Sequence, residues 1–184
     1  MPILIKAHNS EGITFRETDH EPICFVDASN RDDPVDGKAQ SGFVINWGGP
    51  LIWKSSKLNH VGINSTYNEY MALHHAIKQI VWHRQLMQGM GLQIYCRNPT
   101  LIHADNTQAN NLCIDDIVTQ GNMYFRTGYH YNKEAVEDGY VSIRYCKSED
   151  NVSDSMTKGL GSNKIKAVDG LLSGSEPLQL KFYA

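Results

Sequence analysis

The sequence predicts a single α/β domain in which helices flank a mixed sheet of five strands. Three short apolar strands in the first third of the chain are joined by short connections, and two later strands each follow a helical segment. Short connections favour antiparallel pairing, whereas a strand reached through a helical crossover pairs parallel to the first. With 184 residues, the chain is long enough to bury one substantial core.

The expected strands are apolar runs bounded by turn signals, and they cover residues 23–28, 42–47, 51–55, 100–105 and 141–146. The tripeptide Gly48-Gly49-Pro50 separates the second strand from the third and predicts a hairpin. The expected helices cover residues 65–90, 106–114, 123–137 and 153–160. The first of these helices carries apolar side chains at helical spacing, and Gly91 ends it.

Composition and charge narrow the function classes. The formal net charge is −3, which argues against a protein that binds nucleic acid without a basic partner. The four cysteines contain no C-x-x-C pair, so we expect buried free thiols in a reducing compartment such as the cytoplasm. No apolar run approaches the ~18 residues of a membrane span, and the N-terminus lacks the features of a signal peptide. We therefore expect no membrane partner.

Four acidic residues stand in separate segments, each where a core-facing side chain is expected. Asp27 closes the first strand, and Asp105 closes the fourth. Glu69 lies early in the long helix, and Asp154 lies near the start of the last helix. Ligands gather at the carboxyl ends of parallel strands, and buried carboxylates are costly unless they are paired, hydrogen-bonded or bound to a metal. The four acids therefore predict a site for hard divalent cations, of the kind that supports phosphodiester cleavage.

Each acid also has an ordinary structural explanation. Residues 66–69 match the capping box T-x-x-E, in which Glu69 satisfies a backbone N–H, and this pattern taken alone favours capping over metal binding. Asp27 and Asp105 are typical of turns at strand ends, and Asp105 is also a candidate N-cap. Asp154 is favoured near a helix N-terminus by the helix dipole. The coincidence of all four around one predicted crevice favours a single site.

Six segments carry a family resemblance. They are FVDAS (25–29), KAQSGFVINWGGPLIWKSSK (38–57), NSTYNEYMAL (64–73), HADNTQA (103–109), YHYNKEAVEDG (129–139) and SEDNVSDSMTKGL (148–160). In this order and spacing they resemble the ribonuclease H domain of copia-type long-terminal-repeat retrotransposon polyproteins, over residues 21–160. The resemblance implies a ribonuclease H-like fold with the strand order 3-2-1-4-5. It leaves residues 1–20 and 161–184 as extensions without an assigned role.

The resemblance also implies a function and a set of site residues. The domain is expected to cleave the RNA strand of RNA·DNA hybrids endonucleolytically during reverse transcription. Its expected partner is a reverse transcriptase domain of the same polyprotein, and its expected location is the cytoplasm, within retrotransposon particles. The family's catalytic and metal-binding carboxylates match Asp27, Glu69, Asp105 and Asp154. We expect them to hold two Mg²⁺ ions, for which Mn²⁺ can substitute, and their mutual repulsion should raise at least one carboxyl pKa in the metal-free protein.

Polar residues that flank the acids are candidate substrate contacts. A hybrid duplex is recognised through 2′-hydroxyls and backbone across its shallow minor groove. The candidates are Ser29, Asn64, Ser65, Asn68, Asn106 and Gln108. For each of them, a helix cap or an ordinary surface amide is an equally good explanation.

The chain departs from the family pattern in three places. Tyr67-Asn68-Glu69 replaces the family's Glu-Ala-Glu, residues 123–128 replace a more basic segment, and the loop 147–150 contains no histidine. The first of these should matter little to the metal ligands, whereas the other two, together with the net charge of −3, motivate a competing hypothesis. In that alternative the chain is a catalytically weak or inactive, domesticated ribonuclease H-like module that acts in binding or dimerisation. The intact set of four carboxylates argues against it.

Overall fold

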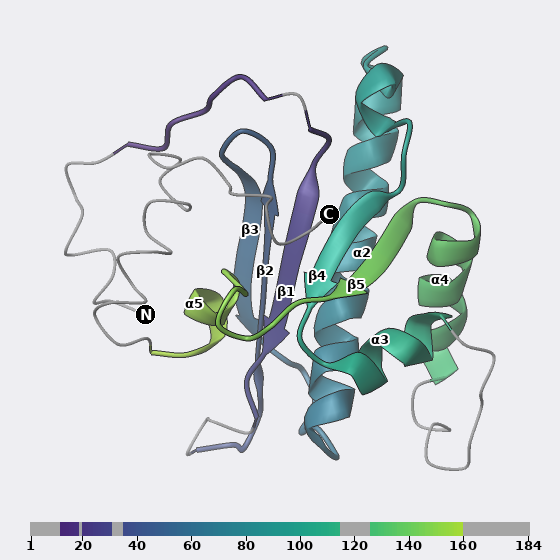
Figure 1. Ribbon diagram of the computed structural model, residues 1–184. Helices are drawn as coiled ribbons and strands as arrows, with labels where there is room; N and C mark the ends of the chain where they lie inside the picture. Colours follow the sequence, from purple (N-terminus) through teal and green to yellow (C-terminus); the bar gives the residue numbers. More distant parts are fainter. Residues whose placement is uncertain (1–11, 19, 31–34, 115–125, 160–184) are drawn as a thin grey trace.

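The computed structural model describes residues 12–18, 20–30, 35–114 and 126–159. Its centre is a five-stranded sheet in the order β3-β2-β1-β4-β5 (Figure 1). The strands are β1 (Ile23–Ala28), β2 (Gln40–Asn46), β3 (Pro50–Lys57), β4 (Thr100–Ala104) and β5 (Val141–Tyr145). Strands β1, β2 and β3 pair antiparallel in succession, while β4 pairs parallel to both β1 and β5. The expected strands and their expected order are confirmed.

Helices cover both faces of the sheet, as expected. They are α2 (Ser65–Gly89), α3 (Thr107–Ile114), α4 (Arg126–Glu137) and α5 (Asp154–Thr157), with a short 3-10 helix, η1 (Gln93–Cys96), that was not predicted. Helices α2, α3 and α4 lie on one face, and α5 lies on the other face against β1 and β2 (Figure 1). The expected first turn of α4, residues 123–125, lies outside the described residues. None of the described helices is both long and apolar enough to span a membrane.

The apolar stripe of α2 forms the main core with one face of the sheet. Tyr70, Leu73, Ile77 and Ile80 are fully buried. They belong to one cluster with alternating strand residues, namely Cys24, Val26, Ala28, Phe43, Ile45 and Ile102. Burial of each large apolar side chain contributes roughly 1.5–3 kcal/mol, so this face is the main source of stability. The four cysteines are free and buried, as expected.

The pairing of β1 with β4 positions the candidate site. In this parallel register Phe25 lies opposite His103 and Val26 opposite Ala104. The next residues along the two strands are Asp27 and Asp105. The Phe25 and His103 rings stack with their centroids 5.2 Å apart, outside the α2 core cluster. Because side chains alternate along a strand, Asp27 shares this second face, which is the face that α5 covers.

Close packing and hydrogen bonds hold α5 against the sheet. A Cβ atom on Gly42 of β2 would lie 2.5 Å from the Cβ of Met156 and 2.9 Å from the Cγ2 of Thr157. Ser55 Oγ donates to the Met156 carbonyl at 2.5 Å. Asn151 Nδ2 fastens the preceding loop by donating to the carbonyl of Val26 at 2.8 Å. The missing side chain at Gly42 therefore allows α5 to approach β1 and β2 closely.

Part of the N-terminal extension runs beside the predicted hairpin. The Arg16 N–H donates to the carbonyl of Gly48 at 2.7 Å. Gly48 has a φ of +67°, and a Cβ atom there would lie 2.0 Å from the Arg16 carbonyl oxygen. A glycine is thus required both by the turn and by the segment that lies against it.

Replacement of Gly42 by alanine should loosen α5. The added Cβ cannot remain 2.5 Å from the Met156 Cβ, so the helix must shift, and overpacking of this kind costs roughly 1–3 kcal/mol. Urea denaturation should therefore show a free energy of unfolding that is lower by about this amount. Gly89→Ala is the matched control, because a Cβ at Gly89 meets nothing within 4 Å. Equal stability of the two variants would contradict the close seating of α5.

Candidate metal centre

Three carboxylates converge at the ends of β1 and β4. Oxygen atoms of Asp27, Glu69 and Asp105 lie within 4.8 Å of one another. Asp27 comes from β1 and is 0% exposed, Glu69 comes from the second turn of α2, and Asp105 follows β4. Asp154, the first residue of α5, is also buried, but among the described residues it is not part of this triangle. The structure thus brings three of the four predicted acids into direct proximity.

Glu69 reaches the triangle from the side of the sheet opposite to α5. It lies close to the helix start, near the strand ends, and its carboxylate accepts a hydrogen bond from the backbone N–H of Ala28. The capping-box interpretation is wrong, because Asn64 caps the helix. Its side-chain oxygen accepts from the Tyr67 N–H at 2.8 Å. The helix therefore begins earlier than the capping box requires, which leaves Glu69 free to join the other acids.

Two residues at the end of α5 contact the acids, and neither was predicted. Thr157 Oγ1 donates a hydrogen bond to Asp27 Oδ2. The Lys158 ammonium lies 3.4 Å from Asp27 Oδ2 and 3.1 Å from Asp154 Oδ1. Their spacing could have placed them near Asp154, since residues three and four positions further along a helix share its face, but it does not predict their contacts with Asp27.

Asp105 is oriented by the loop that follows β5. Ser148 Oγ donates a hydrogen bond to Asp105 Oδ2. The alternative role of Asp105 as an N-cap is wrong, because Asn106 takes that role and its Oδ1 accepts from the Ala109 N–H at 3.0 Å. Asp27 is not a turn residue either, since it lies within β1. Neither a helix cap nor a turn therefore explains why these two positions carry an aspartate.

Burial and mutual repulsion raise the pKa values of two carboxyl groups. Loss of hydration raises the pKa of Asp27 to about 6, although the hydrogen bond from Thr157 and the charge of Lys158 oppose the rise. Loss of hydration, together with the charges of Asp27 and Asp105, raises the pKa of Glu69 to about 9. At least one carboxyl pKa is thus raised, as expected, but burial contributes more to the rise than repulsion between the acids. At neutral pH, Glu69 therefore carries a proton in the metal-free protein.

The donor set suits a hard divalent cation. The triangle offers only carboxylate oxygens, which are the ligands that Mg²⁺ and Mn²⁺ prefer. Among the described residues, Asp27 Oδ1 and Glu69 Oε2 are buried polar atoms without a hydrogen-bond partner. A buried acceptor without a partner costs roughly 1–3 kcal/mol, and a bound cation would satisfy both oxygens at once. The residues present therefore fit a metal ion.

The six candidate substrate contacts fall into two groups. Ser29 and Asn68 are buried, and Asn68 Nδ2 donates to the Ser29 carbonyl at 3.4 Å. Ser29 Oγ accepts from the Gln40 N–H at 2.8 Å, so both side chains support the local structure. The other candidates are exposed or half-buried near the starts of α2 and α3, and they are Asn64, Ser65, Asn106 and Gln108.

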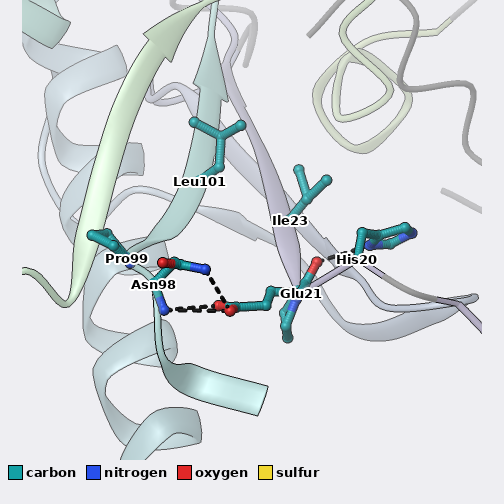
Figure 2. Close-up of a pocket in the computed structure, with 7 residues that line it drawn as sticks. His20, Glu21, Ile23, Asn98, Pro99 and Leu101 are labelled. Atoms are coloured by element: carbon teal, nitrogen blue, oxygen red, sulfur yellow. Dashed lines mark hydrogen bonds between the residues drawn. The ribbon is translucent and has the colours of Figure 1, made fainter. Parts of the chain in front are cut away.

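A separate pocket lies at the opposite ends of β1 and β4 (Figure 2). Its volume is about 310 Å³, and its lining residues are His20, Glu21, Pro22, Ile23, Asn98, Pro99 and Leu101. The Glu21 carboxylate accepts hydrogen bonds from the Asn98 backbone N–H at 3.2 Å and from its Nδ2 at 2.8 Å. The carboxylate of Glu21 is therefore already hydrogen-bonded to another residue of the pocket. None of the four predicted acids lines this pocket.

Comparison with known proteins relates the chain to transposon polyproteins. No protein-family model matches it. The retrovirus-related Pol polyproteins from transposons RE2 and RE1 of Arabidopsis thaliana are 26% and 25% identical to it over 137 residues, which is 74% of this chain and 9% of each relative. The Pol polyprotein from transposon TNT 1-94 of Nicotiana tabacum is 23% identical over 143 residues, or 77% of this chain and 10% of the relative. The chain thus spans about a tenth of the length of these relatives.

Solved structures of ribonucleases H share the fold. LC11-RNase H1, isolated from compost, has a TM-score of 0.56 at 16% identity and covers 83% of this chain and 99% of its own. The same enzyme in complex with an RNA/DNA hybrid has a TM-score of 0.54 at 15% identity, and RNase H1 from Halobacterium salinarum has 0.53 at 17%. Each of these two covers 74% of this chain and 94% of its own. The chain therefore has a ribonuclease H-like fold. In sequence, the chain is similar to Pol polyproteins of plant transposons, which is consistent with the resemblance that its motifs carry.

The raised pKa of Glu69 predicts a pH-dependent loss of stability in the metal-free protein. The carboxyl titrates near pH 4.5 when unperturbed and near 9 in the folded state. Between these values the folded state binds more protons than the unfolded state, so stability falls as the pH rises. Glu69→Gln removes this titration. In thermal melts in EDTA, the melting temperature of the variant relative to that of the wild type should therefore rise steadily from about pH 5 to about pH 9.

A matched control separates this effect from the titration of other groups. Glu134 is exposed on α4, so the melting temperature of Glu134→Gln should follow that of the wild type at every pH. A difference between Glu69→Gln and the wild type that stays constant across the range would contradict the raised pKa.

Proposed function

We propose that this chain is a ribonuclease H domain that cuts the RNA strand of an RNA·DNA hybrid endonucleolytically, with divalent cations as its cofactor. The observation that carries the proposal is the set of three carboxylates within 4.8 Å of one another, at the ends of β1 and β4 in a ribonuclease H fold. The substrate class is supported by a structural neighbour, LC11-RNase H1, whose structure was solved in complex with an RNA/DNA hybrid.

The four acids would serve as ligands to two Mg²⁺ or Mn²⁺ ions. Asp27, Glu69 and Asp105 are the residues that would hold one ion, and Asp154 would contribute to the second together with Asp27. When bound, such ions activate a water molecule and stabilise the charge that develops on the scissile phosphate and its leaving oxygen. The four acids come from four different parts of the fold, namely β1, α2, the end of β4 and α5, because no single strand or helix can bring this many carboxylate oxygens to one place.

The protein's own contribution is to hold these ligands in a fixed orientation. Thr157 holds Oδ2 of Asp27, Ser148 holds Oδ2 of Asp105, and the Ala28 N–H holds the Glu69 carboxylate. Each of these hydrogen bonds uses part of a carboxylate and leaves further oxygen lone pairs for an ion. Ligands that are oriented in advance bind a cation without losing side-chain freedom.

Substrate contacts would come from exposed polar groups near the starts of α2 and α3. Thr66 Oγ1 donates to Gln108 Oε1 at 3.0 Å, so the two helix starts present a joined polar surface. Ser65 and Asn64 are exposed on the same rim. Side-chain amides and hydroxyls of this kind suit 2′-hydroxyl groups of the RNA strand.

The net charge of −3 suggests that another protein domain supplies the basic surface needed to bind nucleic acid. Most of the attraction between proteins and nucleic acids comes from basic side chains that neutralise phosphates. We therefore also propose that residues 21–160 act as one domain beside a reverse transcriptase domain of the same polyprotein, which would supply that basic surface inside cytoplasmic retrotransposon particles.

Cleavage of a labelled RNA·DNA hybrid tests the proposed activity. The wild type should cut the RNA strand with Mg²⁺ or Mn²⁺, and EDTA should stop the reaction. Asp27→Asn should lower the rate by more than roughly 100-fold, because even residues that only orient metal ligands account for roughly 10–100-fold. Asp138→Asn is the control, since Asp138 is exposed in the turn before β5, and its rate should match the wild type.

Two negative results have different meanings. A folded wild type that binds Mn²⁺ but does not cut would indicate that cleavage needs the longer polyprotein. A folded wild type that neither cuts nor binds Mn²⁺ would contradict the proposal and favour the inactive binding module.

A further inference from the structure

Lys158 joins two carboxylates that belong to different parts of the fold. Its Nζ lies 3.1 Å from Asp154 Oδ1 and 3.4 Å from Asp27 Oδ2. The Asp154 side chain is 7% exposed and that of Asp27 is 0% exposed, whereas the Lys158 side chain is 42% exposed. One ammonium group thus bridges two buried carboxylates from the solvent side.

An ordinary helical ion pair does not account for this arrangement. The i,i+4 spacing accounts for the contact between Lys158 and Asp154, but it does not account for the contact between Lys158 and Asp27. Helix α5 has only four residues, so few helical hydrogen bonds depend on the pair. The contact with Asp27 instead joins the end of α5 to the central strand, where a buried charge without a partner is costly.

We propose that Lys158 is an internal cation that holds the place of a metal ion between Asp27 and Asp154 in the metal-free protein, and that it leaves this place when an ion binds there. The inference rests on the metal-dependent function proposed above. The triangle that includes Glu69 and Asp105 already converges to within 4.8 Å. Asp27, Glu69 and Asp105 would therefore hold a first ion with Lys158 in place, and Asp27 and Asp154 would hold a second only after Lys158 has moved.

The contacts around the site allow this exchange. Thr157 is bonded to Asp27, and Ser55 holds the Met156 carbonyl at 2.5 Å, so the backbone of α5 stays in place. Lys158 caps the helix in an extended conformation, with φ −133° and ψ 153°, and its flexible aliphatic stem reaches solvent. An ammonium group and a divalent cation cannot occupy the same place, because like charges repel strongly at such distances. The ammonium can therefore exchange with a cation while α5 remains folded.

Titration calorimetry with Mn²⁺ tests the exchange. Lys158→Met removes the charge and keeps an unbranched stem, whereas Lys158→Arg keeps the charge. The dissociation constant of the weaker Mn²⁺ site should be about tenfold lower, or lower still, in Lys158→Met than in the wild type. A tenfold change corresponds to about 1.4 kcal/mol of binding free energy. Lys158→Arg should titrate like the wild type. In EDTA, Lys158→Met should have a lower melting temperature than the wild type. In saturating Mn²⁺ the two melting temperatures should be equal.

The wild-type protein offers a second test that does not depend on the folding of a variant. A lysine-acylating reagent, followed by peptide mass spectrometry, reports how accessible the Lys158 ammonium is. Saturating Mg²⁺ should raise the rate of acylation at Lys158 and leave the rate unchanged at Lys54, which is exposed on β3.

The outcomes separate this inference from the function on which it rests. A Lys158→Met titration identical to that of the wild type overturns the inference and leaves the proposed function intact. A Lys158 acylation rate that Mg²⁺ leaves unchanged or lowers has the same meaning. Absence of Mn²⁺ binding by the wild type overturns both.

Discussion

The parallel pairing of β1 with β4 is the constraint on which the rest of the site depends. Val26 lies opposite Ala104. The residues that follow them, Asp27 and Asp105, therefore lie next to each other at the carboxyl ends of these two strands. Asp27 is fully buried there, and its lost hydration raises its pKa to about 6. Two acids brought together in this way must be neutralised by protons, by basic groups or by metal ions.

The neighbouring elements supply that neutralisation in the metal-free protein. Helix α5 approaches closely because Gly42 has no side chain, and its end brings a hydroxyl and an ammonium group to Asp27. Glu69 keeps its proton, because its pKa is raised to about 9. One divalent cation at the triangle would replace the proton of Glu69, and a second cation between Asp27 and Asp154 would replace the ammonium group of Lys158. Stability without metal and function with metal therefore depend on the same few side chains.

The sheet order and the converging acids could be predicted, because strand ends, crossovers and ordered motifs are visible in the sequence. At Glu69 the sequence left two explanations open, because its segment matches a capping box, although the four acids together favoured a single site. The cap at Asn64 and the tertiary contact with Ala28 decide against the capping box. Thr157 and Lys158 were missed. Their contacts with Asp27 depend on how closely α5 approaches β1, and no local pattern contains that distance.

Anomalous diffraction from crystals soaked in Mn²⁺ would show whether the three carboxylates bind an ion, because it locates the ion without relying on activity. We expect a Mn²⁺ peak bound by oxygens of Asp27, Glu69 and Asp105, with Asp154 still beside Lys158 when only one ion is present. A well-ordered site with no peak there, or with Mn²⁺ bound only elsewhere, would contradict it.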